Sequence, residues 1–205
     1  MDERIRELLR QIACLEDELR SELHARESRV LFTLRGKRVA FERDVRQMHR
    51  RLKRGVLRWL TTDRPLNFVT GPIIYAMAVP LVILDLCVTL FQASCFPIYG
   101  IARVRRGDYI VFDRHQLGYL NIIERLHCEY CAYANGLIAY MSEIVARTEQ
   151  YFCPIKHAHK VLGSHHRYAR FLEYGDAADF HARLEAFRAA LATDATRRDA
   201  PGGRG

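Results

Sequence analysis

The feature that most constrains this chain is an apolar stretch of 38 residues, 65–102, in which Asp85 is the only charged residue. Eighteen or more nearly uncharged apolar residues in a row are typical of a membrane segment. The rest of the chain is polar, which brings the mean hydropathy of the whole down to −0.16. We therefore predict that this stretch contacts a membrane. The sequence indicates where the protein works more clearly than what it does.

Two arrangements of the stretch in a bilayer are open. In one, residues 73–96 between Pro72 and Pro97 form a single span of about 36 Å, enough to cross a hydrocarbon core of about 30 Å. In the other, a helical hairpin breaks near Pro80 and returns to the same side. Basic residues, which collect on the cytoplasmic side, flank both ends and favour the hairpin with cytoplasmic soluble parts. A buried hairpin in a soluble helical protein is the third interpretation.

The segment before the stretch is strongly basic. Residues 34–64 hold eleven Lys or Arg and three acidic residues, so this window alone carries a net charge of +8, equal to that of the whole chain. Because it ends at Trp59 and Leu60, beside the apolar stretch, it favours anionic lipid. The sequence shows no nucleic-acid-binding motif, and we do not expect nucleic acid as a partner. The predicted lipid contacts are Arg50, Arg51, Lys53, Arg54 and Arg58.

The N-terminal region predicts a long amphipathic helix. Its apolar residues follow the three-and-four spacing of a coiled coil: Ile5, Leu8, Ile12, Leu15 and Leu19. We predict that residues 1–33 bind a second copy of the chain or another helical partner. Residues 1–60 as a whole are expected to form one long helix, or a helical hairpin that bends near residues 35–37.

Residues 103–192 predict a small cytoplasmic helical domain, followed by a disordered tail at 193–205. Asp113 has the character of a helix N-cap, and the helix after it is expected to reach Cys128. Asn135-Gly136 favours a turn, with a second helix at 137–150. A last amphipathic helix is predicted at 176–191. The fold class is therefore mainly α, with a candidate metal site in this domain.

The metal prediction rests on the spacing Cys-x2-Cys followed, 21 residues later, by Cys-x3-His. Four such ligands suit tetrahedral Zn²⁺, and a closed set of four is typical of a structural site. An iron–sulfur cluster is the less favoured occupant, and a redox-active dithiol or three buried thiols are the other interpretations. The predicted ligands are Cys128, Cys131, Cys153 and His157, with His127 and His159 as alternatives. The chain must turn back near Asn135 to bring them together.

Catalytic candidates are few. Asp85 is an acid inside the apolar stretch, and Asp113 and His115 could act on a lipid head group where the stretch ends. We find no phosphate-binding loop, nucleophile elbow or HExxH motif. The favoured function is a non-enzymatic, membrane-anchored scaffold or adaptor that assembles through its N-terminal helix. The alternatives are a monotopic enzyme acting on a lipid-linked or amphiphilic substrate, and a metal-handling or redox membrane protein.

Overall fold

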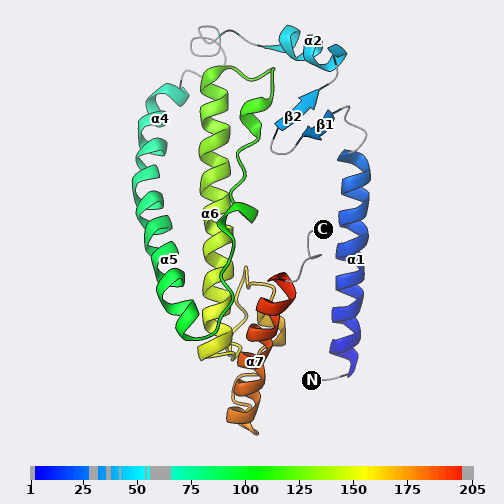
Figure 1. Cartoon of the computed structure of the whole chain (residues 1–205), viewed down its shortest axis with the longest axis vertical. Coiled ribbons are helices and arrows are strands. Elements are labelled where there is room, and N and C mark those ends of the chain that lie inside the picture. The colour runs from blue at the N-terminus through cyan, green and yellow to red at the C-terminus, as the bar shows by residue number, and fades with distance from the viewer. Residues whose placement is uncertain are drawn as a thin grey trace. The chain divides into compact units, whose positions relative to one another are not determined.

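The computed structural model describes residues 3–27, 32–35, 38–41, 43–53, 55 and 66–199. These residues are mainly helical, as the sequence predicts (Figure 1). The chain divides into two compact units. The first is Met1–Val56 with Asp113–Arg125, and the second is Leu57–Phe112 with Leu126–Gly205.

The first unit holds α1 (Glu3–Glu27), a two-stranded sheet of β1 (Phe32–Arg35) and β2 (Arg38–Phe41), and α2 (Arg43–Leu52). The antiparallel strands pair Phe32 with Phe41 and Arg35 with Arg38. Both predicted forms of residues 1–60, one long helix and a helical hairpin that bends near residues 35–37, are therefore wrong, because paired strands lie on either side of that bend. Alternating apolar and polar residues in FTLR suit a strand.

His49 connects the parts of this unit. Its ring lies against Phe41 of β2 at 4.9 Å and against Tyr119 at 5.0 Å, between ring centroids. A Cβ at Gly118 would come within 3.3 Å of the His49 Cβ, so this glycine lets the chain approach α2 closely. His49 is buried, and it acts here as a packing residue between the sheet, α2 and the segment 113–125.

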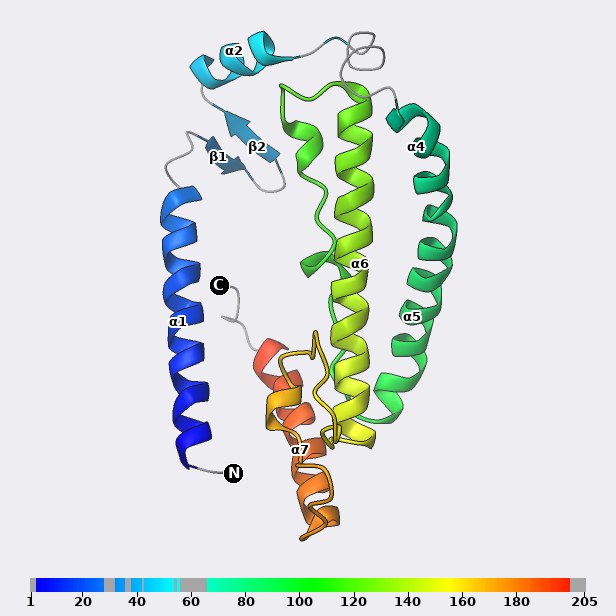
Figure 2. The same cartoon turned by 180° about the vertical axis from the view of Figure 1, so that it is seen from behind.

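The second unit is built on α4 (Leu66–Ala76), α5 (Ala78–Ile98), the larger part of α6 (Ile122–Phe152) and α7 (Phe180–Asp199), with short 3-10 turns η2 (Arg106–Asp108) and η4 (Tyr168–Arg170). Helices α5 and α6 run side by side in the same direction (Figure 2). Asp85 contacts Tyr133 and Gln92 contacts Tyr140. Residues 99–112, hereafter the return segment, lead back along this helix pair.

The apolar stretch does not form a hairpin. Helix α4 ends at Ala76, and α5 begins at Ala78 and continues in the same overall direction (Figure 1). Pro80 lies in the first turn of α5, where a missing N–H leaves no intrahelical bond unmade. In a regular helix the Pro80 ring would clash with the carbonyl group of Ala76, four residues earlier. Pro80 therefore interrupts the helix without reversing the chain.

Helix α6 begins later and ends later than predicted. Its cap is Asn121, whose Oδ1 accepts hydrogen bonds from the N–H groups of Ile123 and Glu124, at 3.0 and 2.9 Å. The Glu124 carboxylate accepts from the Asn121 N–H at 2.9 Å, which completes a capping box. Asp113 makes no side-chain capping bond. The helix passes through Asn135-Gly136 without a turn, so the predicted break there is wrong.

The core of the second unit lies where α5, the return segment, α6 and α7 meet. Its buried side chains are Phe96, Ile101, Val104, Ile110, Leu137, Tyr140, Ile144 and Leu191. Helix α7 extends to Asp199, which corrects the prediction of disorder for residues 193–199. This segment contains Ala and Arg, which favour helix, and no proline occurs before Pro201. Residues 200–205 lie outside the described part of the chain.

Candidate functional site

Asp85 is held in a structural ion pair. Its carboxylate accepts from Arg106 Nη2 at 2.7 Å and Nε at 3.1 Å, and from the Tyr133 hydroxyl at 3.0 Å. Thr89 Oγ1 donates to it over a longer 3.4 Å. These partners come from η2, α6 and α5 itself. The acid in the apolar stretch therefore joins the return segment to both helices.

Asp113 directly precedes η3 (Arg114–Gln116), and His115 lies within it. Both residues are exposed. Catalytic acids and bases are typically placed in clefts where burial or a neighbouring charge shifts the pKa. The exposed position of this pair offers no such cleft. Its proposed role in catalysis stays a prediction without support from its surroundings.

The structure does not bring the four predicted metal ligands together. Cys131 lies within α6, and Cys153 follows the last residue of the same continuous helix. At about 1.5 Å per residue, the 22 steps from Cys131 to Cys153 correspond to about 33 Å along the axis. Zinc ligands must all lie within about 2.3 Å of one ion. Within the described residues, no group of three His, Cys, Asp or Glu side chains is placed to hold a metal.

The alternative ligands lie in other contacts. The His127 ring stacks on Tyr75 of α4, with centroids 5.5 Å apart. The ring of His157 stacks on Tyr168 at 6.2 Å, and its backbone N–H donates to the Tyr168 hydroxyl at 2.7 Å. His159 is exposed. All six cysteines are free thiols.

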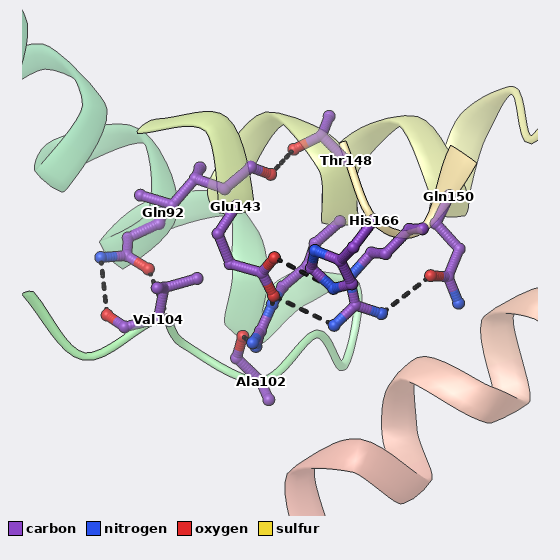
Figure 3. Close-up of polar contacts among 10 residues, drawn as sticks. Gln92, Ala102, Val104, Glu143, Thr148, Gln150 and His166 are labelled. Atoms are coloured by element: carbon purple, nitrogen blue, oxygen red, sulfur yellow. Dashed lines mark hydrogen bonds and ion pairs between the residues drawn. The ribbon is translucent and has the colours of Figure 1, made fainter. Parts of the chain in front are cut away.

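A buried charged cluster, which the sequence analysis missed, lies on the inner side of α6 (Figure 3). Glu143 Oε1 accepts from Arg147 Nε at 2.7 Å and from Arg167 Nη2 at 3.0 Å. Arg147 Nη1 donates to the Ala102 carbonyl at 2.7 Å, and Arg167 Nη1 donates to Gln150 Oε1 at 2.9 Å. The sequence feature that could have revealed this cluster is the i, i+4 spacing of Glu143 and Arg147 on an otherwise apolar helix.

Burial alone would raise the pKa of Glu143, but the hydrogen bonds from Arg147 and Arg167 outweigh it and hold the pKa below its ordinary value. Glu143 is therefore a carboxylate at neutral pH. The Arg147 side chain is only 1 % exposed. The cluster ties α6 to the return segment and to residues 165–170, which is a structural role.

The second unit has an exposed apolar surface on the outward side of α4 and α5, hereafter the apolar face. It consists of exposed large hydrophobic side chains: Val69, Ile73, Ile74, Met77, Val79, Val82, Ile83, Leu86, Leu90, Phe91 and Ile98. An 18-residue part of the segment Val69–Ile98 has a mean hydropathy of 2.3, and none of that part is buried within the molecule. It is the one helical segment in the described residues that is long and apolar enough to span a membrane.

Helix α6 adds a second outward surface without charge, hereafter the α6 stripe. Its exposed residues repeat every three or four positions from Cys131 to Val145, and Phe152 follows seven residues later: Cys131, Asn135, Ile138, Ser142, Val145 and Phe152. In the same stretch Glu143 and Arg147 are buried and paired, whereas Glu149, at the position after Val145 in this register, is 29 % exposed and pairs with His165. Both long helices of the second unit thus carry exposed, uncharged surfaces.

Comparison with models of known protein families, with curated proteins and with solved structures finds no match. The functional interpretation therefore rests on this chain's own surfaces. Of the predicted lipid-binding residues, Arg50, Arg51 and Lys53 are exposed at and just after the end of α2, whereas Arg54 and Arg58 lie outside the described residues. On α1, Leu8, Ile12, Leu15 and Leu19 are 44–64 % exposed.

Proposed function

We propose that this protein is a membrane-anchored, non-enzymatic scaffold that assembles through α1. The observation that carries the proposal is the apolar face, eleven large hydrophobic side chains on one helical segment that the second unit leaves uncovered. Removing one such side chain from water is worth on the order of 1.5–3 kcal/mol. Monomers in water rarely leave so large a contiguous apolar surface exposed. Lipid is the partner that suits a surface of this length and composition.

The scaffold role is favoured over catalysis by what the polar residues do. Asp85 and Glu143 are two acids whose side chains lie in the interior of the second unit, and arginine side chains hold each of them in place. They link elements of the fold. The basic residues on both sides of Val69–Ile98 favour placing the polar parts in the cytoplasm.

Helix α1 supplies the assembly surface in this proposal, with a second copy of the chain as its partner. Four exposed apolar side chains repeat at intervals of four, three and four residues: Leu8, Ile12, Leu15 and Leu19. Such a seam is buried when two helices supercoil. Leu15→Asp is expected to lower the assembled mass measured by light scattering, and Glu16→Gln, next to the seam, is expected to leave it unchanged. Equal masses for both variants would contradict the assembly role.

The anchor is tested by flotation with lipid vesicles after an alkaline wash. The triple variant Ile83→Asp, Leu86→Asp, Leu90→Asp places three charges on the apolar face and is expected to remain in the soluble fraction. Leu162→Asp is the matched control, because Leu162 is 86 % exposed but lies outside the apolar face. It is expected to float like the wild type. A folded triple variant that still floats would contradict the proposal, with circular dichroism as the check of folding.

A further inference from the structure

We infer, on the basis of the proposed membrane anchor, that the apolar face enters a single leaflet of an anionic membrane and does not span the bilayer. Helices α5 and α6 then lie along the membrane plane, with the return segment at the level of the lipid head groups. The inference comes from the direction of the two helices, the path of the chain between them, and the charges on that path.

The first step is the parallel packing of α5 and α6. Contacts advance together along both helices: Asp85 with Tyr133, Gln92 with Tyr140, and Tyr99 with Tyr151. Two parallel helices require a connection that travels back along their length. A pair of spanning helices with this packing would therefore need a chain that recrosses the membrane between them.

The second step is where that connection runs. The Ala102 carbonyl accepts from Arg147, and Val104 exchanges hydrogen bonds with Gln92 at 2.9 and 3.3 Å (Figure 3). Further along, Arg106 pairs with Asp85. The return segment thus lies beside the middle of Val69–Ile98 in a largely non-helical conformation. Lipid-exposed irregular backbone does not occur in a hydrocarbon core.

The third step is the charge on the return segment. Arg103, Arg105 and Asp108 are exposed, and the Arg106 side chain is 44 % exposed although it pairs with Asp85. Asp85 lies near the midpoint of Val69–Ile98. In a spanning arrangement these exposed arginines would lie close to the bilayer centre, where a charge costs several kcal/mol. At the head groups, the same side chains meet water and phosphate.

The fourth step is that the charged and apolar sides of α5 are opposite. Residues that face the rest of the unit recur every three or four positions: Leu81, Asp85, Val88, Gln92 and Phe96. The exposed residues Val79, Ile83, Leu86 and Leu90 recur with the same spacing on the other side of the helix. When that side enters lipid, the return segment stays outside the hydrocarbon. The uncharged residues 131–145 of the α6 stripe allow this part of α6 to approach the lipid as well.

Length agrees with this orientation. The 30 residues of Val69–Ile98 extend about 45 Å, well beyond a hydrocarbon core of about 30 Å. A helix that lies in the interface has no such mismatch, and amphipathic helices there insert about 5–10 Å. The excess of arginine on the return segment and the overall charge of +8 select an anionic leaflet.

Depth measurements with spin labels test the inference. Single cysteines replace Val69, Ile83, Ile98 and Arg105 in a background whose native cysteines are serine or alanine, reconstituted in vesicles of phosphatidylcholine with phosphatidylglycerol. We expect labels at Val69, Ile83 and Ile98 at similar depths of about 5–10 Å, and the Arg105 label accessible to an aqueous nickel reagent. A label at Ile83 about 15 Å deep, with Arg105 shielded from nickel, would overturn the inference but leave the anchor intact.

A second measurement needs no substitution. Polarised infrared spectra of the wild-type chain in oriented bilayers are expected to show the amide dichroism of helices near the membrane plane. Dichroism of helices along the membrane normal would overturn the inference. Vesicles of pure phosphatidylcholine are expected to bind at least tenfold less protein than those with phosphatidylglycerol, and equal binding would contradict the anionic preference. A wild-type chain that binds neither vesicle would refute the anchor itself.

Discussion

Asp85 shows how a single charge can be retained in an apolar helix. Its partners Arg106 and Tyr133 belong to other elements, so the carboxylate joins three parts of the second unit at one point. Glu143 does the same on α6, with two arginines around one carboxylate. Residues of this kind attract a catalytic interpretation in the sequence, but their partners give them a structural role.

At the residue scale we predict a large loss of stability for Glu143→Gln. The change leaves Arg147 buried without its carboxylate, and breaking a buried pair typically costs about 3–5 kcal/mol. Glu185→Gln is the control, because Glu185 is 69 % exposed and pairs with Arg188 on the surface. Its cost is expected to stay below about 1 kcal/mol. Urea unfolding in detergent measures both, and equal costs would contradict the structural role of the cluster.

The same carboxylate predicts a pH dependence. Because the folded pKa of Glu143 is below its unfolded value of about 4.3, the unfolded chain binds more protons between the two values. The stabilisation is therefore complete above the unfolded pKa and is lost as the pH falls through the folded pKa. The difference in unfolding free energy between wild type and Glu143→Gln is expected to shrink below pH 4.3. A difference that grows with acid would give the opposite sign.

At the element scale, the N-terminus of α6 and its glycine illustrate how local chemistry sets a helix. Asn121 and Glu124 form the capping box, and Gly136 is in mid-helix. A Cβ on Gly136 would lie 2.6 Å from the Tyr109 carbonyl oxygen, so the glycine serves close packing of the return segment on α6. The same residue that signals a turn in the sequence is required here for contact.

Asn121→Ala is predicted to destabilise the first unit together with the start of α6. Loss of an N-cap side chain typically costs about 1 kcal/mol, and Asn121 is buried. Asp113→Ala tests the N-cap that the sequence favours but the structure does not use. Its effect is expected to stay within about 0.5 kcal/mol. Thermal unfolding measures the stability of both variants. A larger loss of stability for Asp113→Ala than for Asn121→Ala would place the cap at Asp113.

Gly136→Ala is predicted to destabilise the fold although alanine favours helix. The new methyl would press on backbone of the return segment, and overpacking typically costs about 1–3 kcal/mol. Gly71→Ala in α4 is the matched control, because a Cβ there meets nothing within 4 Å. The higher helix propensity of alanine alone predicts that this variant gains up to about 1 kcal/mol in unfolding free energy. Urea midpoints that move in the same direction for both would contradict the close contact.

At the scale of the whole molecule, the chain separates into two units with different surfaces. The second unit carries the apolar face and the α6 stripe, and the first carries α1 and the basic end of α2. In the proposed function, the two tasks are therefore separable: lipid contact belongs to the second unit and assembly to the first.

We predict that deletion of residues 1–27 lowers the assembled mass to that of a single chain while the protein still floats with vesicles. The physical reason is that the exposed seam of α1 is removed and the apolar face is untouched. Light scattering in detergent and vesicle flotation measure the two properties on the same sample. Loss of flotation on this deletion would show that the tasks are coupled.

Much of the element content could be predicted from the sequence, because helical periodicity and the uncharged stretch are local patterns. The N-terminal helix, the apolar segment with its interruption upstream of Pro80, and the C-terminal helix follow from spacing and from proline chemistry. Local signals failed where they were ambiguous. Gly36 was interpreted as a bend between helices, although strands pair around it, and Asn135-Gly136 was interpreted as a turn inside what is a continuous helix.

The sequence by itself determined that residues 65–102 carry one charge and are suited to lipid, since composition needs no knowledge of contacts. Only the tertiary structure decided what that charge does, because the partners of Asp85 lie 21 and 48 residues away in the chain. It also separated the cysteines of α6 from Cys153, since a continuous helix holds its ends apart. The parallel course of α5 and α6, which sets how the apolar face can meet a membrane, likewise depends on packing between distant residues.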